Sequence, residues 1–422
     1  MPAEYLQVDA SAHCQLACPS CPTASGATRP ALGAGHLDPD TFEALLRSNP
    51  ALREIELSNY GEMFLNPRLR DLLRIANEKN VVLHADNGVN FNFAPDAVIE
   101  ALVRYRFRSM TVSIDGASPE TYRQYRVKGD FDQVIANIRR LNALKREQNA
   151  AFPVLKWQFI VFGHNEHEIA KARAMAAELD MGFRPKISWD DDVSPIRNRE
   201  LVQLQLPGRA LTREQHRQST GNDYMRGICL QLWNAPVLNW NGLLTGCCRN
   251  FWGDFGANAF ADGLDRALNA EPLRYAKAML EGTAPERDGI PCTTCDLYKT
   301  LADSKRWITR DEIETAMVKP GILLGVAVDK GSSVATHVDV FVVAGHRTQP
   351  ELFVQPPPAI RIDLTRQHAI HFSIAKPGDY LVYILAKQLD PTYRTQYARI
   401  PPLTQAITVA DRPARQEVQV RL

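Results

Sequence analysis

Three cysteines near the start of the chain, Cys14, Cys18 and Cys21, are the residues whose type and spacing most directly indicate chemistry. They follow the pattern C-x3-C-x2-C within one short segment. Iron–sulfur clusters that only carry electrons use four cysteine ligands. Three thiolates in one loop instead suit a [4Fe-4S] cluster with one iron left free to bind a small molecule. A zinc knuckle or buried free thiols are the alternatives, although zinc normally has a fourth ligand close by.

The other five cysteines form a second group. No cysteine lies in residues 22–228 or 296–422, whereas cysteines that only fill the core would be scattered along the chain. Four of them have the spacing C-x17-C-x44-C-x2-C: Cys229, Cys247, Cys292 and Cys295. Four thiolates suit either a second iron–sulfur cluster or a structural zinc ion. Cys248 is left over, or Cys247 if the spacing is read one residue later.

A framework must position these cysteines, and residues 1–190 alternate strand-like and helix-like segments. We expect strands over 5–10, 54–58, 81–85, 109–114, 154–161 and 183–188, and helices over 39–47, 68–79, 95–105, 131–148 and 166–179. Such alternation predicts an α/β fold with a parallel sheet covered by helices. Six β/α units are too few for a closed eight-fold barrel, so the sequence predicts a partial (β/α)6 barrel. Active sites of such barrels lie at the carboxyl ends of the strands, where the loop of Cys14 follows the first strand.

The cysteine loop resembles that of the radical S-adenosylmethionine (SAM) family, in which SAM binds the open iron and a partial (β/α)6 barrel is the fold. Motifs near the strand ends carry the same resemblance. Gly61-Glu62 is similar to the family's Gly-Glu-Pro motif, which binds the SAM amino group, and Asn87 matches a strand-end Asn-Gly. Ser113 and Arg126 match the positions that hold the ribose and carboxylate of SAM. An ordinary turn and a solvated arginine are the plainer interpretations.

The second cysteine group resembles the shortened auxiliary-cluster domain of this family (SPASM or twitch type), with a layout similar to that of its aminocyclitol (2-deoxy-scyllo-inosamine) dehydrogenases. The resemblance implies an auxiliary [4Fe-4S] cluster on Cys229, Cys247, Cys292 and Cys295. Gly242, five residues before Cys247, favours Cys247 over Cys248 as the ligand. A four-cysteine zinc ribbon remains the alternative. Cys248 is then either a hydrogen donor to a substrate radical or a small core residue.

The resemblance also implies the reaction: SAM is cleaved reductively to methionine and a 5′-deoxyadenosyl radical, which removes a hydrogen atom from the substrate. An auxiliary cluster would accept the remaining electron. The leading hypothesis is therefore a SAM-dependent dehydrogenase acting on a hydroxylated, sugar-, cyclitol- or aminoglycoside-like molecule, with flavodoxin or ferredoxin as electron donor. Asp190, Asp192 and Arg197, beyond the sixth strand, are candidate bases or hydroxyl-binding groups, although acidic loops are more often simply solvated.

Three alternatives remain open at this point. The first is an epimerase in which Cys248 returns a hydrogen atom to the substrate. The second is an enzyme that modifies a ribosomal peptide, although no peptide-binding winged helix is recognisable before the barrel. The third is an interaction protein with structural iron sites, against which the intact three-cysteine loop argues.

The composition is ordinary for a globular protein, with 45% hydrophobic and 23% charged residues and a formal net charge of +1 among 422 residues. No basic run indicates nucleic-acid binding. No apolar stretch of roughly 18 residues indicates a membrane span, and no signal peptide is recognisable, so we expect a cytoplasmic protein.

We expect three domains: the barrel over 1–200, the auxiliary-cluster domain over 201–318, and a third domain over 319–422. Residues 190–228 should form a polar, irregular bridge. Six short β-rich runs between Leu323 and Leu422 predict an antiparallel β-sandwich of unknown role.

Overall fold

The computed structural model of the chain describes residues 3–150, 152–188 and 192–317, and seven backbone strands between residues 322 and 421. The chain forms two compact units, Met1–Ala316 and Met317–Leu422. The predicted boundary between 200 and 201 falls inside the first unit. None of the described helices is long and apolar enough to cross a membrane.

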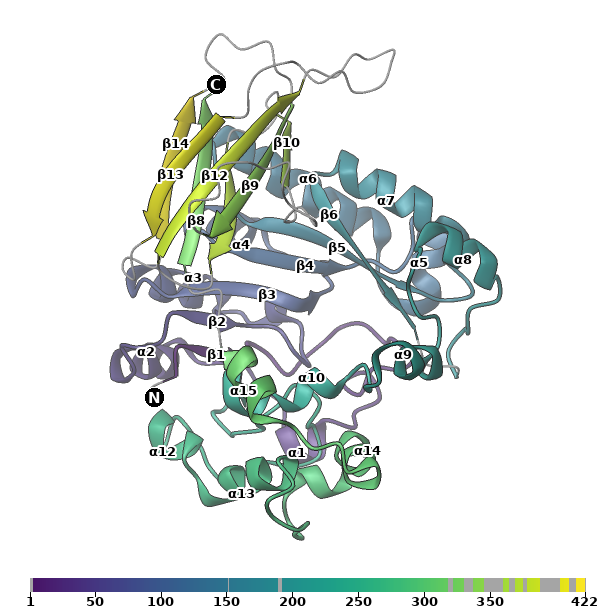
Figure 1. Cartoon of the computed structure of the whole chain (residues 1–422), viewed down its shortest axis with the longest axis vertical. Coiled ribbons are helices and arrows are strands. Elements are labelled where there is room, and N and C mark those ends of the chain that lie inside the picture. Colours follow the sequence, from purple (N-terminus) through teal and green to yellow (C-terminus); the bar gives the residue numbers. More distant parts are fainter. Residues whose placement is uncertain are drawn as a thin grey trace. The chain divides into compact units, whose positions relative to one another are not determined.

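A parallel seven-stranded sheet organises the first unit (Figure 1). Its strand order is β6-β5-β4-β3-β2-β1-β7. The strands are β1 (Tyr5–Val8), β2 (Glu54–Glu56), β3 (Val82–Val89), β4 (Ser109–Ser113), β5 (Val154–Val161), β6 (Met181–Ile187) and β7 (Val237–Leu238). The predicted α/β class is confirmed, and the parallel sheet is consistent with a partial barrel.

The helices that follow the strands begin at recognisable caps. Asp38 accepts hydrogen bonds from the backbone of Asp40 and Thr41 at the start of α2, and Asp130 accepts one from Gln133 at the start of α6. The helices are α1 (Arg29–Leu32), α2 (Pro39–Ser48), α3 (Leu69–Glu78), α4 (Asp96–Arg104), α5 (Pro119–Tyr125), α6 (Phe131–Glu147) and α7 (Ile169–Glu178), with 3-10 turns at Met63–Leu65 and Glu166–Glu168. The sequence prediction missed α5, although Ser118 caps it and Pro119 opens it.

The two faces of the sheet differ in chemistry. One face is apolar and packs into the core through Leu6, Ile55, Leu83, Met110 and Trp157. The opposite face carries buried polar side chains, including Gln7, Glu56, His84, Thr111 and Gln158.

The sheet curves around this polar face. Arg184 Nη1 on β6 donates to the carbonyl oxygen of Asp86 on β3, at 3.3 Å, although β6 and β3 are not neighbours in the sheet. We call this the concave face. A polar concave face indicates space for a polar ligand rather than a second hydrophobic layer.

The segment after β6 is not the irregular bridge that the sequence predicted, because α8 and α9 form within it. Asn198 and Thr212 cap these helices by accepting hydrogen bonds from Leu201 and Gln215. The helices of this part are α8 (Arg199–Gln205), α9 (Arg213–Thr220), α10 (Arg226–Cys229), α11 (Gln231–Asn234), α12 (Leu264–Leu268), α13 (Glu271–Leu280), α14 (Asp296–Ser304) and α15 (Arg310–Met317), with a 3-10 turn at Pro291–Thr294.

Strand β7 joins this part to the barrel sheet. It pairs with β1 in parallel register, Val237 opposite Gln7 and Leu238 opposite Val8. The chain then turns back at Gly242, whose positive φ of 87° favours glycine, and Thr245 donates its N–H to the carbonyl of Val237. Cys247 and Cys248 therefore follow a hairpin that is hydrogen-bonded to the edge of the barrel sheet.

The second unit contains two sheets, β10-β9-β12-β13 and β11-β8-β14. Its strands are β8 (Ile322–Asp329), β9 (His337–Ala344), β10 (Ile360–Asp363), β11 (Ala369–Ile374), β12 (Gly378–Lys387), β13 (Leu403–Val409) and β14 (Arg415–Arg421). The prediction of wholly antiparallel pairing is wrong for one pair, because β14 runs parallel to β8. The prediction also missed β13. That the two sheets pack as a sandwich stays a prediction.

Candidate functional site

The loop after β1 brings the first three cysteines together. Cys14, Cys18 and Cys21 pack in one small cluster with Leu16, Tyr125 and Phe162. Two backbone hydrogen bonds shape the loop, from Cys21 to the carbonyl of Cys18 (3.1 Å) and from Ala17 to the carbonyl of Val127 (2.9 Å). The three thiols thus lie together beside α5 and the end of β5.

Gly61 and Glu62 hold this loop from the side of β2. A Cβ on Gly61 would lie 1.7 Å from the carbonyl oxygen of Ser11, so only glycine permits the two backbones to approach. The N–H of Glu62 donates to the carbonyl of His13 at 2.7 Å. The motif therefore has a structural role at the base of the cysteine loop.

The Glu62 carboxylate lies close to Cys14 but is already hydrogen-bonded. Its oxygens accept the backbone N–H of Asn90 at 2.6 Å and of Phe64 at 3.2 Å. The side-chain amide of Asn90 in turn reaches Cys14 Sγ at 3.6 Å. Burial raises the pKa of Glu62 to about 7, against the effect of these backbone hydrogen bonds. Glu62 thus retains acceptor capacity beside the cysteine loop, because each carboxylate oxygen can accept more than one hydrogen bond.

Arg126 lies on the opposite side of the loop. Its Nε and Nη2 donate to Asp115 Oδ2 at 2.7 and 2.6 Å, and its Nη1 lies 3.7 Å from Cys18 Sγ. Asp115 is fully buried at the end of β4 and also accepts the N–H of Ile160. Asp115 therefore fixes the guanidinium at the edge of the cysteine cluster.

Asn87 and Ser113 lie at the carboxyl edge of the sheet. Asn87 is inside β3 rather than beyond it, in a stretch where the pairing with β4 is irregular, and its Nδ2 donates to the carbonyl of Ser58 at 2.7 Å. Ser113 Oγ accepts from Gln158 Nε2 at 3.3 Å. A Cβ at Gly88, where φ is 135°, would lie 2.7 Å from Ser113 Oγ.

One observation in the structure itself indicates that these residues fit a bound nucleoside. Gln158 Oε1 is buried and has no hydrogen-bond partner in the described part of the chain. An unpaired buried acceptor is costly unless a ligand hydroxyl or amino group meets it. It lies next to Ser113, the residue that the resemblance assigns to the ribose.

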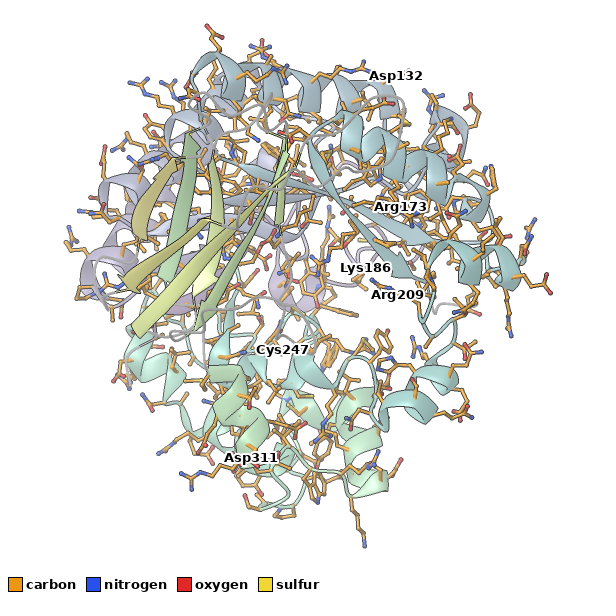
Figure 2. The ribbon with its side chains drawn as sticks, turned by 45° about the horizontal axis from the view of Figure 1, so that its top comes forward. Asp132, Arg173, Lys186, Arg209, Cys247 and Asp311 are labelled. Atoms are coloured by element: carbon orange, nitrogen blue, oxygen red, sulfur yellow. The ribbon has the colours of Figure 1, made fainter. Side chains whose placement is uncertain are left out.

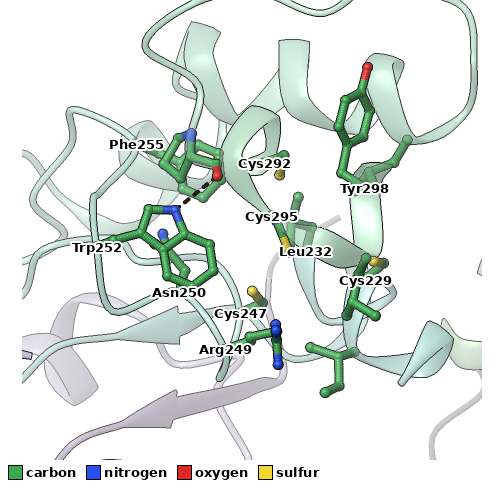
Figure 3. Close-up of a pocket in the computed structure, with 14 residues that line it drawn as sticks. Cys229, Leu232, Cys247, Arg249, Asn250, Trp252, Phe255, Cys292, Cys295 and Tyr298 are labelled. Atoms are coloured by element: carbon green, nitrogen blue, oxygen red, sulfur yellow. Dashed lines mark hydrogen bonds between the residues drawn. The ribbon is translucent and has the colours of Figure 1, made fainter. Parts of the chain in front are cut away.

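Cys229, Cys247, Cys292 and Cys295 line a single pocket (Figure 3). The rest of its lining is mostly apolar and aromatic, including Leu232, Trp252 and Phe255, with Arg249 and Asn250 as polar members. Trp252 Nε1 donates to the carbonyl of Pro291 at 3.0 Å and so closes the wall beside Cys292. Among the described residues, no three Cys, His, Asp or Glu side chains are arranged to hold a single metal ion.

Thiols from several elements meet at this pocket. Cys229 ends α10, Cys247 follows the hairpin of β7, and Cys292 and Cys295 flank the turn before α14. Burial raises the pKa of Cys247 to about 12 and that of Cys229 still further. Such thiols deprotonate readily only when a metal takes the place of the proton. The donor set therefore fits an iron–sulfur cluster.

Cys248 lines a different space. With Cys21, Tyr60, Phe251 and Arg249 it borders a cavity of about 560 Å³. The Tyr60 and Phe251 rings meet edge to face at 5.8 Å between centroids, and Thr23 Oγ1 donates to the carbonyl of Tyr60 at 2.6 Å. This cavity, which we call the Cys21–Cys248 cavity, connects the two cysteine groups.

The structure gives less direct support for the candidate acids and for Arg197. Asp190 lies outside the described residues. The N–H of Arg197 donates to Glu166 Oε2 at 2.9 Å, beside the turn that follows β5. Neither Asp192 nor Arg197 is among the residues that line the Cys21–Cys248 cavity.

Sequence reasoning missed several residues of the site. Gln158 and Lys186 alternate with apolar neighbours on β5 and β6, so the period of two in these strands was an available signal. Figure 2 shows Lys186 near the end of β6, on the side toward Cys247. Tyr60 directly precedes the Gly61-Glu62 motif, whereas Asp9, which accepts the N–H of Tyr60 at 3.3 Å, belongs to no motif.

Residues 10–175 match the family model described as the radical SAM superfamily. This part of the chain therefore forms a radical SAM domain. A domain of this superfamily implies a [4Fe-4S] cluster and SAM as cofactors. No curated protein matches the chain.

Solved structures share the fold at low sequence identity. SuiB from Streptococcus suis is 14% identical, with a TM-score of 0.51 over 71% of this chain and 72% of SuiB. SuiB bound to its precursor peptide SuiA gives 13% identity and a TM-score of 0.48 over 71% of this chain and 70% of SuiB. BtrN in complex with AdoMet and 2-DOIA is 13% identical, with a TM-score of 0.40 over 71% of this chain and 92% of BtrN. At these identities the likeness to SuiB shows the fold alone.

Proposed function

We propose that this chain is a radical SAM oxidoreductase that dehydrogenates a hydroxylated small molecule of the sugar or cyclitol type. One observation carries the proposal: Ile228 and Arg249 line both the four-cysteine pocket and the Cys21–Cys248 cavity. A substrate in the cavity would have the first cysteine loop on one side and the four-cysteine pocket behind a shared wall. That arrangement suits hydrogen removal on one side and electron removal on the other.

The cofactors would be held by three sets of side chains. Cys14, Cys18 and Cys21 would hold the cluster to which SAM binds, and the pocket thiols Cys229, Cys247, Cys292 and Cys295 would hold the auxiliary one. Gly61, Glu62, Asn87, Ser113 and Arg126 would enclose SAM, with Gln158 as an added acceptor. When bound, these groups supply a hydrogen-abstracting radical and a one-electron acceptor.

The chain itself must supply the proton acceptor. Oxidation of an alcohol to a ketone removes one hydrogen atom from carbon, one proton from the hydroxyl group and one electron. The radical takes the hydrogen atom and the second cysteine site takes the electron, so a side chain or water must take the proton. Asp190 and Asp192 remain our candidates, with Arg197 as a neighbouring binding group, because they follow β6 at the carboxyl edge of the sheet.

Epimerisation is the second candidate, and the position of Cys248 favours it. Its side chain borders the same cavity as Cys21 rather than the four-cysteine pocket. A thiol there could return a hydrogen atom to the substrate radical from the face opposite to the abstraction. The net reaction would then leave the oxidation state of the substrate unchanged.

An anaerobic assay in D2O with SAM and reductant separates the two candidates. We would incubate the reconstituted protein with sugars, aminocyclitols and aminoglycosides and read product mass together with 5′-deoxyadenosine. A product lighter by two hydrogen atoms supports the dehydrogenase. A product with one hydrogen replaced by deuterium supports epimerisation by an exchangeable thiol.

The control replaces Cys14, Cys18 and Cys21 by alanine, which should abolish formation of 5′-deoxyadenosine. Persistent cleavage of SAM in this variant would mean that the reacting cluster is bound elsewhere. Absence of 5′-deoxyadenosine in the reduced wild-type protein would contradict both candidates.

A further inference from the structure

Several acidic groups of the concave face lie beside a basic group, and Glu54 and Glu56 share one, His84. Glu56 Oε2 lies 2.9 Å from His84 Nδ1, and Asp86 Oδ1 lies 2.9 Å from Lys156 Nζ. Asp115 is paired with Arg126, as described above.

Two basic side chains on β6 have no such match. Arg184 is exposed, and its one hydrogen bond to the described part of the chain goes to a backbone carbonyl, that of Asp86. Lys186 is half-buried, and no acidic side chain among the described residues pairs with it. Burial lowers the pKa of Lys186, and the charge of Arg184 lowers it further, whereas the charge of Asp115 acts in the opposite direction. The Lys186 ammonium therefore lies on the concave face without a salt-bridge partner among the described residues.

Lys186 lies at the site rather than on an outer surface. In the sheet register it is opposite Ile160, which packs against the cluster formed by the first cysteine loop. Paired residues of neighbouring parallel strands share a face, so the Lys186 side chain starts from the concave face. Its electrostatic neighbours include Arg126 and Asp115 on one side and Cys248 on the other. Lys186 is thus within electrostatic range of the SAM-side residues and of Cys248, although it is not among the residues that line the Cys21–Cys248 cavity.

We propose that Lys186, with Arg184 behind it, binds an anionic group of the substrate, so that the substrate is an acid-bearing polyol such as a sugar carboxylate or sugar phosphate. The proposal rests on the proposed function and narrows its substrate class. It disfavours an aminocyclitol or aminoglycoside at this position, because an ammonium group beside the Lys186 ammonium would be repelled.

The carboxylate of SAM is the competing anion, and its own site is better filled by Arg126. Arg126 contacts Cys18 directly at 3.7 Å. No such contact between Lys186 and a cysteine of the loop occurs among the described residues. A guanidinium fixed by Asp115 also suits a planar carboxylate better than a single ammonium does. Lys186 is therefore available to bind the substrate rather than SAM.

The test measures binding to the reconstituted full-length protein by calorimetry, in the presence of SAM. The probes are D-glucuronate, glucose 6-phosphate, glucose and inorganic phosphate. We expect the acidic probes to bind more tightly than glucose, and K186Q to weaken them by at least about tenfold, because a hydrogen bond to a charged group is lost. K186R should restore most of the affinity. K171Q, at an exposed lysine of α7, should bind like the wild type.

Each outcome decides the inference. Preference for glucuronate over the phosphates, or the reverse, identifies the anion. Equal binding of glucose and the acidic probes, binding of none of them, or acidic-probe binding that K186Q leaves unchanged overturns the proposal. Loss of SAM affinity in K186Q would assign Lys186 to SAM instead and also overturns it. Formation of 5′-deoxyadenosine by the wild type, measured separately, shows whether the proposed function itself stands.

Discussion

Cys247 and Cys248 are adjacent in the sequence but border different spaces. Cys247 lines the four-cysteine pocket, whereas Cys248 lines the cavity that it shares with Cys21. The backbone N–H of Cys248 is held by Gln231 Oε1 at 2.8 Å, and the N–H of Cys247 by the carbonyl of Thr245 at 3.0 Å. Two neighbouring thiols can therefore serve two different purposes.

This division predicts different effects of two alanine substitutions on iron content. Cys247→Ala should lower the iron of the reconstituted protein from roughly eight to roughly four atoms per chain, since one [4Fe-4S] site is lost. Cys248→Ala should retain the full iron content and the cleavage of SAM. Iron and sulfide analysis with electron paramagnetic resonance would check both variants. Loss of a cluster in Cys248→Ala but not in Cys247→Ala would reverse our ligand assignment.

Gly61→Ala should destabilise the first unit and loosen the cysteine loop. The added methyl group would meet the Ser11 carbonyl at 1.7 Å, and one of the two backbones would have to move. We expect a loss of about 1–3 kcal/mol in the free energy of unfolding, as for other overpacked sites. Gly182→Ala is the matched control, because its nearest contact would be at 3.9 Å. Chemical denaturation of both variants measures the difference, and equal stabilities would show that the Gly61 contact is easily relieved.

Arg126→Lys should weaken SAM binding by at least about tenfold, because lysine cannot contact Asp115 and the cysteine loop at the same time. In the wild type, Nε and Nη2 bind Asp115 while Nη1 points to Cys18. Arg123→Lys, at an exposed position of α5, should be neutral. Equilibrium binding of SAM to both reconstituted variants checks this. Unchanged affinity in Arg126→Lys would remove Arg126 from the SAM site.

Asp9 should make stability fall as pH rises toward neutrality. It is only 3% exposed, and burial followed by the charge of Glu56 raises its pKa to about 7, against the hydrogen bond from Tyr60. Its unfolded pKa is about 3.9, so between these values the folded chain binds a proton that the unfolded chain releases. The Asp9 contribution therefore favours folding below the lower value and is lost as pH rises through about 7.

Asp9→Asn removes this proton uptake and keeps an acceptor for Tyr60. The stability of the variant relative to the wild type should increase from pH 5 to pH 7.5, by about 1 kcal/mol per pH unit. Denaturant unfolding at several pH values under anaerobic conditions measures it. Asp132→Asn, at an exposed position on α6, is the control. A flat difference between Asp9→Asn and wild type over this range would contradict the assignment.

Much of the barrel could be predicted from local sequence signals. Alternating apolar residues placed β5 at Val154–Val161, with both ends as observed. Strand β7 could not be found in this way, because two residues carry no periodic pattern and its pairing with β1 depends on distant residues. The helices α8 and α9 were missed because their exposed, polar surfaces give no apolar stripe.

The functional site likewise contains residues that the sequence predicted and residues that it did not. Cysteine spacing located both thiol groups, the first as a short motif in one loop and the second as a cluster of cysteines late in the chain. Glu62 was expected to contact the SAM amino group, whereas the fold also gives it the backbone groups of Asn90 and Phe64 to accept. The alternation along β5 and β6 could have placed Gln158 and Lys186 on the polar face. It could not show that Gln158 Oε1 lacks a hydrogen-bond partner among the described residues, because that depends on residues distant in the sequence.

The pairing of β7 with β1 has a consequence for biosynthesis. Gln7 Nε2 donates to the carbonyl of Ala235, a residue 228 positions later in the chain. During translation, one edge of β1 must therefore stay unpaired until more than half of the protein has left the ribosome. Over that interval the nascent chain exposes Cys14, Cys18 and Cys21 next to an open strand edge. Chaperone engagement and the first cluster insertion would then compete for the same stretch of emerging polypeptide.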